Sequence, residues 1–579
     1  MSTGFRSFFS DLRKKRIIEI LAAFIAGGWL IIEFVDRILV AHYHFPDKAI
    51  DITFITLLCA LICTLLWRWF SGREAPSKFK LELVLIPLVV LITVLLDINL
   101  LLHLKSPESE PFPATPKWKN SVAVLPFVDM SPQKDQEYFC DGMTEELINR
   151  LSNIKELKVP ARTSAFMFKG KAEDIREIGR KLDVRTVLEG SIRKEDSQLR
   201  ITVQLVNASD SFHIWSETFD KELTKVFAIQ DEIALTIADK LKLTLLGEQE
   251  KRLVKRYTEN LEAYKLYLEG LYYWNKRTGK DLTKAIELFN QAIDKDSKYA
   301  MAYVGLADSY NLLTIYGDAR PLEAYPRAKA AATKALEINQ TLAEAHNSLA
   351  YVYERYDWNW KAAETEFKRA LELNPNYATG HFWYSELLMY LGRFEESIRE
   401  MKRALELDPV SLIINGSLGR AYFMARQFDQ ALAQLHETLE MDPNFALTRL
   451  ILGNAYLAKH QFSEGIDELR KARELSGDAV VMVGTLGVAY ATAGKLEEAK
   501  GILEGLKARS QKQYVSSYWI GRVFGAIGDV DKLFELWNKA YEERTEWLIE
   551  IKSDPSLVPY QSDPRYKAIL KKMGFEYGE

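Results

Sequence analysis

Three acidic residues near the start of a predicted helix are the strongest candidates for chemistry in this sequence. Asp141, Glu145 and Glu146 follow the stretch SVAVLPFVDMSPQKDQEYFC, in which an apolar run ends at Pro126 and a polar loop leads into a helical pattern. Carboxylates paired in this way could act as a general acid and base. More often, acidic residues at the start of a helix complement its dipole and cap its free N–H groups. The pattern therefore favours a structural role and leaves an enzyme as a minor alternative.

Other motifs that carry catalysis or bind ligands are missing from the sequence. The stretch FKGKA at 168–172 contains Gly-Lys, but Ala172 replaces the Ser or Thr of a phosphate loop and the first glycine is absent. No G-x-G-x-x-G follows the first predicted strand, and the chain contains no H-E-x-x-H or C-x-x-C. His213 has no histidine partner in its domain for a catalytic triad. We therefore predict no catalytic residue, no cofactor and no metal site.

The composition argues against nucleic acid as a partner. The chain has 579 residues, with 76 Lys and Arg against 80 Asp and Glu, so its formal net charge is −4. A nucleic-acid-binding protein normally carries an excess of Lys and Arg. Cys59 and Cys63 lie in an apolar stretch, and only Cys140 lies in the remaining part. No intramolecular disulfide is available there, so cysteine usage does not identify the compartment.

Three apolar stretches crowd the amino-terminal part of the chain, at about 17–40, 52–69 and 81–104. Each approaches the roughly 20 residues that a helix needs to cross a bilayer. Basic residues precede the first stretch at 13–16 and also separate the second from the third, so both clusters are expected in the cytoplasm. These features predict a membrane region over 1–105 with three transmembrane helices in a bacterial inner membrane. The N-terminus would be cytoplasmic and the soluble domains periplasmic, or cytosolic if the third stretch does not span.

The second half of the chain repeats with a period of 34 residues. The repeated motif ends at Pro375, Pro409 and Pro443. A small residue recurs at the same spacing, at Ser385, Gly419, Gly453, Gly487 and Gly521. This period, with Leu-Gly-x-x-Tyr, Ala and Pro at fixed offsets, is the signature of the tetratricopeptide repeat. We predict about eight repeats over 261–550, after a helical connector at 247–260 and before a cap at 551–579.

A stack of such repeats has a concave surface built mainly from the first helix of each pair. The side chains expected on that surface are rich in aromatic residues and arginine, which are common in peptide-binding sites. They are Asn347, Tyr351, Arg355, Phe382, Glu386, Tyr390, Arg420, Phe423, Asn454, Tyr518 and Arg522. Any one of them could instead pack only against neighbouring helices. As a set they predict a groove for a protein or peptide partner, and the sequence does not identify a small-molecule ligand.

The region 121–246 mixes strands with helices, after a Pro-rich linker at 106–120 that is expected to be extended. A buried strand opens it, LKVPART reads as a second short strand, and three further strands form an antiparallel run. An amphipathic helix closes it. This order predicts a small α/β sandwich.

The same region resembles a known family. The segments SVAVLPFVDMS, DQEYFCDGMTEELINRLSNIKELKVPARTSAFMFKGK and LDVRTVLEGSIRKEDSQLRITVQLVNASDSFHIWSETFD are similar to the TolB amino-terminal-like domain, which is related to FlgO-type domains. The resemblance implies a module that precedes tetratricopeptide repeats in bacterial membrane proteins. It also implies kinship with proteins in which the pair follows a nucleotide cyclase or a winged-helix domain. No catalytic residue carries over, and 1–120 has no room for either output domain.

The predicted fold class is therefore multidomain, with amino-terminal transmembrane helices, a small α/β domain of the TolB amino-terminal-like type and an all-α tetratricopeptide solenoid. The predicted function is a membrane-anchored, non-enzymatic scaffold that binds partner proteins or peptides. The alternative is a sensory or regulatory component of a signalling system that lacks its own output domain. An enzyme that uses Asp141, Glu145 and Glu146 is the third hypothesis.

Overall fold

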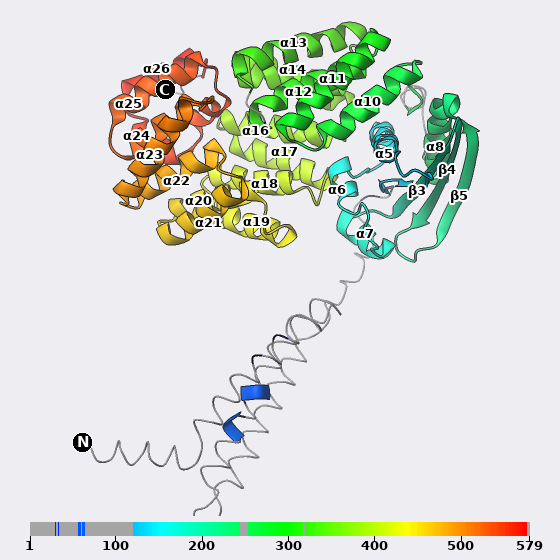
Figure 1. The fold of residues 1–579 in the computed structure, drawn as a ribbon, viewed down its shortest axis with the longest axis horizontal. Helices are drawn as coiled ribbons and strands as arrows, with labels where there is room; N and C mark the ends of the chain where they lie inside the picture. Colours follow the sequence, from blue (N-terminus) through cyan, green and yellow to red (C-terminus); the bar gives the residue numbers. More distant parts are fainter. Residues whose placement is uncertain are drawn as a thin grey trace, which may run out of the picture. The chain divides into compact units, whose positions relative to one another are not determined.

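The structure is a computed structural model that describes residues 120–243, 253–316 and 319–575, together with Trp118 and a few positions between 29 and 63. The chain divides into two compact units, Met1–Ala114 and Thr115–Glu579. The second unit contains an α/β domain followed by a helical solenoid (Figure 1).

The predicted transmembrane helices are not supported. In the part of the chain that the structure describes, no helix has the length and apolar character needed to cross a membrane. The predicted spans 17–40, 52–69 and 81–104 lie outside the described residues apart from single positions such as Trp29 and Cys63. We therefore correct the fold class to an α/β domain and an all-α solenoid, and withdraw the inner-membrane location and the membrane integration. These predictions rested on the length of the apolar stretches and on the placement of the basic residues that flank them.

The α/β domain is a single sheet with strand order β1-β3-β4-β5. Its strands are β1 (Val122–Val124), β2 (Val128–Asp129), β3 (Thr186–Glu195), β4 (Gln198–Asn207) and β5 (His213–Glu222). β1 and β2 both pair in parallel with β3, and β3, β4 and β5 form the predicted antiparallel run. Pro126 separates β1 from β2, since proline has no N–H to donate to a ladder.

The helices of this domain are α5 (Glu137–Ser152), α6 (Arg162–Phe166), α7 (Ile175–Leu182) and α8 (Val226–Lys240). α5 and α8 pack against each other and against the sheet, whose inward residues Leu199, Ile201 and Val203 are buried. One element differs from expectation. LKVPART forms no strand beyond a single bridge from Lys158 to Ser121, and the Ala161 N–H at its end donates to the solenoid.

The solenoid consists of antiparallel helix pairs (Figure 1). The pairs are α10 (Leu261–Trp274) with α11 (Gly279–Lys295), α12 (Ala300–Tyr316) with α13 (Pro321–Ile338), α14 (Ala343–Val352) with α15 (Trp360–Leu373), α16 (Ala378–Tyr390) with α17 (Phe394–Leu407), α18 (Leu412–Met424) with α19 (Phe428–Met441), α20 (Ala446–Ala458) with α21 (Phe462–Leu475), α22 (Val480–Thr492) with α23 (Leu496–Ser510), and α24 (Ser517–Ala526) with α25 (Val530–Glu542). Three short elements follow: η4 (Glu546–Lys552), η5 (Pro555–Tyr560) and α26 (Pro564–Lys572).

The periodic small residues allow the two helices of a pair to approach closely. A Cβ atom added at Gly419 would lie 2.6 Å from Leu435, and one at Gly453 would lie 3.0 Å from the carbonyl oxygen of Gly465. These distances are shorter than van der Waals contact, so a larger side chain would push the pair apart. The small column thus sets the helix spacing that gives the solenoid its curvature.

The α/β domain is docked on the solenoid. α5 packs on α10, where a Cβ atom at Gly142 would lie 2.7 Å from Leu268. The Asn376 side-chain amide, in the loop before α16, donates to the carbonyl oxygens of Ser152, Ile154 and Leu157 at 3.2–3.3 Å. One repeat further on, the same edge of the solenoid bonds to α6. The Ala161 N–H donates to the Leu407 carbonyl at 2.9 Å, and the Ser164 N–H donates to the Asp408 carboxylate at 2.9 Å.

The C-terminal elements fold back onto the third helix pair. That pair is interrupted after α14 by η3 (Tyr353–Asp357), a single wide turn, and by Trp358, whose φ is +53°. The Trp360 indole N–H donates to the Met573 carbonyl at 2.9 Å, and the Trp360 ring stacks on Phe575. The Arg544 guanidinium donates to the Tyr356 carbonyl at 3.1 Å. Helix pairs three to eight therefore form a closed arc, with η4 packed against α16 and η3 on its inside.

Candidate functional site

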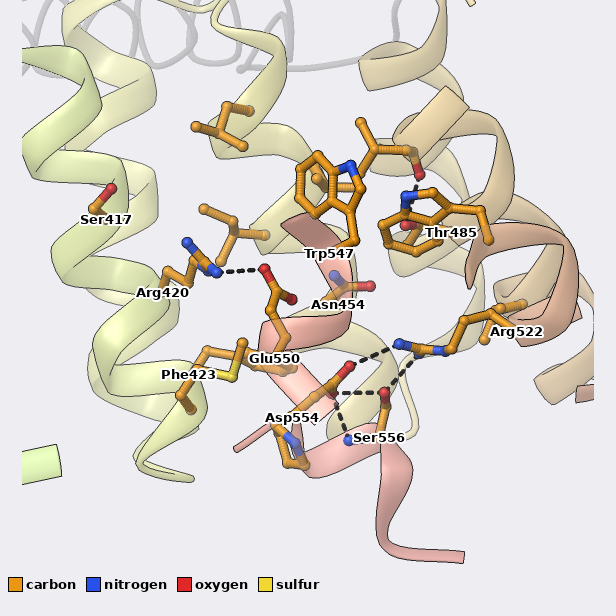
Figure 2. Close-up of a pocket in the computed structure, with 18 of the residues that line it drawn as sticks. Ser417, Arg420, Phe423, Asn454, Thr485, Arg522, Trp547, Glu550, Asp554 and Ser556 are labelled. Atoms are coloured by element: carbon orange, nitrogen blue, oxygen red, sulfur yellow. Dashed lines mark hydrogen bonds and ion pairs between the residues drawn. The ribbon is translucent and has the colours of Figure 1, made fainter. Parts of the chain in front are cut away.

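The inside of this arc contains a cavity of about 640 Å³. Its walls come mainly from the first helices of successive pairs, α12 to α24, together with η4 and η5 of the C-terminal segment (Figure 2). Most of the wall is aromatic or aliphatic, including Phe382, Phe423, Leu450, Trp519 and Trp547. Polar side chains occupy a smaller part of the wall. Such a combination is typical of ligand sites, where apolar surface supplies affinity and a few polar groups fix orientation.

Most residues predicted for the concave surface line this cavity. They are Tyr351, Arg355, Phe382, Glu386, Arg420, Phe423, Asn454 and Arg522. The first helix of each pair carries them inward because residues separated by a full repeat occupy equivalent positions. The structure therefore gathers them in one place, although nothing bound there identifies their partner.

Three predicted residues, Asn347, Tyr390 and Tyr518, do not line the cavity. Asn347 is fully buried. The Tyr390 hydroxyl accepts a hydrogen bond from Arg420 at 3.0 Å, and the Tyr518 hydroxyl accepts one from Arg522 at 3.0 Å. Tyr518 also stacks on Trp537 with ring centroids 5.7 Å apart. The two tyrosines therefore hold the wall residues Arg420 and Arg522 in place.

Sequence reasoning missed the residues that the C-terminal segment contributes. Trp547 and Glu550 lie on η4, and Asp554 and Ser556 lie at the start of η5 (Figure 2). Their only signal in the sequence is their position directly after the last repeat, where we placed a boundary at residue 550. Nothing in the repeat pattern indicates that this segment folds back into the arc, because the period ends before it.

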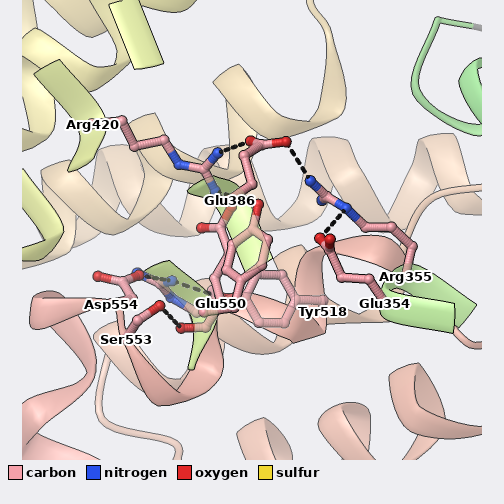
Figure 3. A network of polar contacts seen from close by, with 10 residues as sticks. Glu354, Arg355, Glu386, Arg420, Tyr518, Glu550, Ser553 and Asp554 are labelled. Atoms are coloured by element: carbon pink, nitrogen blue, oxygen red, sulfur yellow. Dashed lines mark hydrogen bonds and ion pairs between the residues drawn. The ribbon is translucent and has the colours of Figure 1, made fainter. Parts of the chain in front are cut away.

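A network of buried charges spans the cavity wall (Figure 3). The Arg355 guanidinium lies 3.0 Å from the Glu354 carboxylate and 2.9 Å from that of Glu386. Glu386 also accepts from Arg420 at 3.0 Å, and Arg420 forms a further, very short ion pair with Glu550. The network therefore connects η3, α16, α18 and η4.

A second ion pair lies at the opposite side of the C-terminal segment. The Arg522 guanidinium donates to the Asp554 carboxylate at 2.9 Å and to the Ser556 hydroxyl at 2.8 Å (Figure 2). Asp554 also caps the N-terminus of η5 through the Ser556 N–H at 2.8 Å. The position of η5 is thus fixed by charge as well as by packing.

Burial raises the pKa of three acids in this region. Burial raises the pKa of Glu354 to about 8, in spite of the neighbouring Arg355, and raises the pKa of Glu546 to about 7. Burial also raises the pKa of Glu550, against the opposing charge of Arg420. With Glu354 protonated near neutral pH, three arginines of the wall face the carboxylates of Glu386, Glu550 and Asp554.

The acidic residues of α5 do not line the cavity. The Asp141 carboxylate pairs with Lys169 at 2.6 Å. The Glu145 carboxylate pairs with Arg162 at 2.9 Å and accepts from Asn275 of the solenoid at 3.1 Å. Glu146 is buried, which raises its pKa to about 7. These acids therefore sit in ion pairs or in the packed contact between α5 and α10, rather than at the solvent-exposed helix start expected of caps.

Two family models match parts of the chain. The model described as the second domain of a HilA/YgeH-like transcriptional regulator matches residues 118–236. The tetratricopeptide-repeat model matches residues 359–411 and 417–480. The solenoid is thus built of tetratricopeptide repeats, which confirms that prediction. The predicted TolB amino-terminal-like family is not shown, and the HilA/YgeH-like model matches the α/β domain instead.

A curated protein of Rhizobium meliloti (strain 1021), named putative adenylate cyclase 3, is 37% identical to this chain over 199 residues. The match covers 34% of this chain and 34% of that protein, so the chain spans about a third of the relative's length.

Several solved structures resemble the solenoid. Pseudomonas aeruginosa pilF is 21% identical, with 38% of this chain and 94% of that chain covered at a TM-score of 0.30. A human IFIT1 dimer with PPP-AAAA is 17% identical, with 55% and 78% covered at a TM-score of 0.34. Scores of this size carry no argument about ligand or mechanism.

Proposed function

We propose that this chain is a non-enzymatic binding protein that holds a segment of a partner protein in the cavity of its closed arc. The cavity itself carries the proposal. It is large enough for several side chains, its aromatic walls offer apolar contact, and its curvature is set by repeats that are rigidly stacked. Aromatic residues and arginine are also the residue types that dominate binding energy at protein interfaces.

The proposal is tested by closing the cavity without touching its charges. Asn454 lies on α20, is half-buried and lines the wall, so Asn454→Trp would fill part of the space. Peptides selected from a random display library on the full-length protein should lose at least about tenfold in affinity for this variant, equivalent to about 1.4 kcal/mol. The matched control is Lys471→Trp, because Lys471 lies exposed on the outer helix α21. It should bind the peptides as the unchanged protein does.

Equal binding by Asn454→Trp and the unchanged protein would place the ligand elsewhere and contradict the proposal. The non-enzymatic part has its own test, prompted by the name of the Rhizobium relative. Purified full-length protein incubated with ATP and a divalent cation should form no cyclic AMP. Product that accumulates in proportion to the protein would overturn this part.

A second candidate function is regulation, with the binding event as its input. The HilA/YgeH-like match over 118–236 and the cyclase-named relative favour it. In this version the docked α/β domain and the solenoid respond together to the ligand and act on a separate output protein. Cells of the native host that carry Asn454→Trp should then change their transcript profile or cyclic nucleotide level relative to Lys471→Trp cells. Identical profiles would argue against a regulatory role.

A further inference from the structure

Three buried arginines of the cavity wall, Arg355, Arg420 and Arg522, already lie against carboxylates of the protein itself. Arg355 is shared between Glu354 and Glu386, and Arg420 between Glu386 and Glu550 (Figure 3). The Arg420 guanidinium donates to Glu386, Glu550 and the Tyr390 hydroxyl, and the Arg355 guanidinium donates to Glu386. An acidic ligand would therefore compete with Glu386 and Glu550 for the same buried guanidinium groups.

The C-terminal segment supplies part of this neutralising charge. Glu550 on η4 pairs with Arg420, and Asp554 before η5 pairs with Arg522. η4 is firmly anchored, because its side chains Leu548, Ile549 and Ile551 are fully buried. The two carboxylates therefore behave as fixed parts of the wall rather than as groups that a ligand displaces easily.

The part of the cavity wall that is not engaged in ion pairs is mostly uncharged. Aromatic side chains come from several repeats and from η4, including Phe382, Phe423, Trp519 and Trp547. Asn454 offers an amide donor and acceptor that match a peptide bond. The remaining charged residue of the lining, Arg426, is exposed.

We propose that the cavity selects an uncharged, aromatic or aliphatic segment of its partner and rejects acidic segments, because Glu550 and Asp554 occupy the buried arginines Arg420 and Arg522 of its wall. This inference rests on the proposed function and specifies the chemistry of the partner. An acidic side chain brought to this wall would lose its hydration and meet carboxylates that are already in place. A basic side chain would be repelled by the arginines, and the carboxylates that could bind it are already paired with those arginines. An apolar segment has no charged group to dehydrate, and burial of its apolar surface favours binding.

Three sets of synthetic peptides of equal length test the inference on the full-length protein. One set is aromatic and aliphatic, one is acidic and one is basic, and binding is measured by fluorescence anisotropy. The apolar set should bind at least about tenfold more tightly than either charged set.

Removal of one fixed carboxylate should change this selectivity. Glu550→Gln takes the partner carboxylate from Arg420, so the acidic set should gain affinity while the apolar set changes little. Asp554→Asn removes the carboxylate that pairs with Arg522. This variant replaces Glu550→Gln if circular dichroism shows that Glu550→Gln is poorly folded. Glu535→Gln is the matched control, because Glu535 lies exposed on α25 and pairs with Lys532. It should leave all three affinities unchanged.

The outcomes separate the two proposals. If the acidic set binds the unchanged protein most tightly, or if neither Glu550→Gln nor Asp554→Asn improves acidic binding, the selectivity is wrong while the binding function stands. If the unchanged protein binds none of the three sets, both the selectivity and the proposed function fail.

Discussion

Arg420 holds two carboxylates from different elements, Glu386 on α16 and Glu550 on η4. Buried ion pairs of this kind are weak evidence for stability, because well-packed apolar residues often stabilise a core as well or better. Their presence at a cavity wall is therefore better explained by what they do to the wall. They fix the position of η4 and cancel charge that the cavity would otherwise present.

Glu354 should make the stability of the protein depend on pH. Its pKa is raised by burial from an ordinary 4.5 to about 8, so the folded state holds a proton that the unfolded state has lost. Stability should therefore fall as the pH rises from 4.5 towards about 8. Glu354→Gln cannot ionise and should show a smaller fall, measured as urea unfolding midpoints across that range.

The control for this experiment is Glu396→Gln. Arg393 lowers the pKa of this exposed carboxyl below 4.5, so any effect of Glu396 on stability should appear at lower pH. A fall that is identical in the unchanged protein and in Glu354→Gln would show that Glu354 does not hold this proton.

At the scale of the elements, the small residues of the repeats act through distance between helices. Gly453 and Gly465 face each other across α20 and α21, and a Cβ atom on either would meet the other's carbonyl oxygen at 3.0 Å. A backbone atom cannot move aside as a flexible side chain can. Gly501 on α23 is different, since a Cβ atom there would meet nothing within 4 Å.

This difference gives a matched pair of substitutions. Gly453→Ala should lower the free energy of unfolding by about 1–3 kcal/mol, because it overpacks the helix pair. Gly501→Ala should raise that free energy by up to about 1 kcal/mol, because alanine has the higher helix propensity. Chemical denaturation of both variants checks the signs. Equal effects would mean that helix spacing does not depend on the small residue.

At the scale of the whole second unit, the α/β domain is bound to the edge of the solenoid and is not an independent module. The loops before α16 and α18 bond to the segment that leads from α5 to α6. Movement of the repeats would therefore be felt by α6 and by the segment between α5 and α6. This contact supplies a physical route between the cavity and the α/β domain, which a regulatory role would require.

Asn376→Ala should loosen this contact. The carbonyl oxygens of Ser152, Ile154 and Leu157 would lose their donor, at a cost of about 1–3 kcal/mol for buried acceptors left unsatisfied. Hydrogen exchange should accelerate between residues 150 and 165. The control is Asn290→Ala, whose exposed amide bonds only within its own helix. Equal exchange in both variants would mean that Asn376 does not hold the domain in place.

The repeats and their inward residues could be predicted because a fixed period places equivalent residues on the same face in every repeat. Phe382, Arg420 and Asn454 were found in this way. The C-terminal part of the site could not be predicted, because Glu550 and Asp554 reach the cavity through a fold-back that no periodicity encodes. The contact of Glu145 with Asn275 of the solenoid was missed for the same reason. Contacts between distant segments leave little trace in one sequence.

The turn at Tyr353–Asp357 is followed by Trp358 and by Trp360, which contacts the C-terminal end of the chain. This contact affects how the repeats unfold. In an open array each repeat touches only its neighbours, and the terminal ones fray first. Here Trp360 bonds to Met573, 213 residues away, so the last repeats are tied to the third. A fluctuation that separates any one of them must also strain that distant bond. The arc should accordingly unfold cooperatively. The cavity should therefore keep its shape as long as the arc is folded.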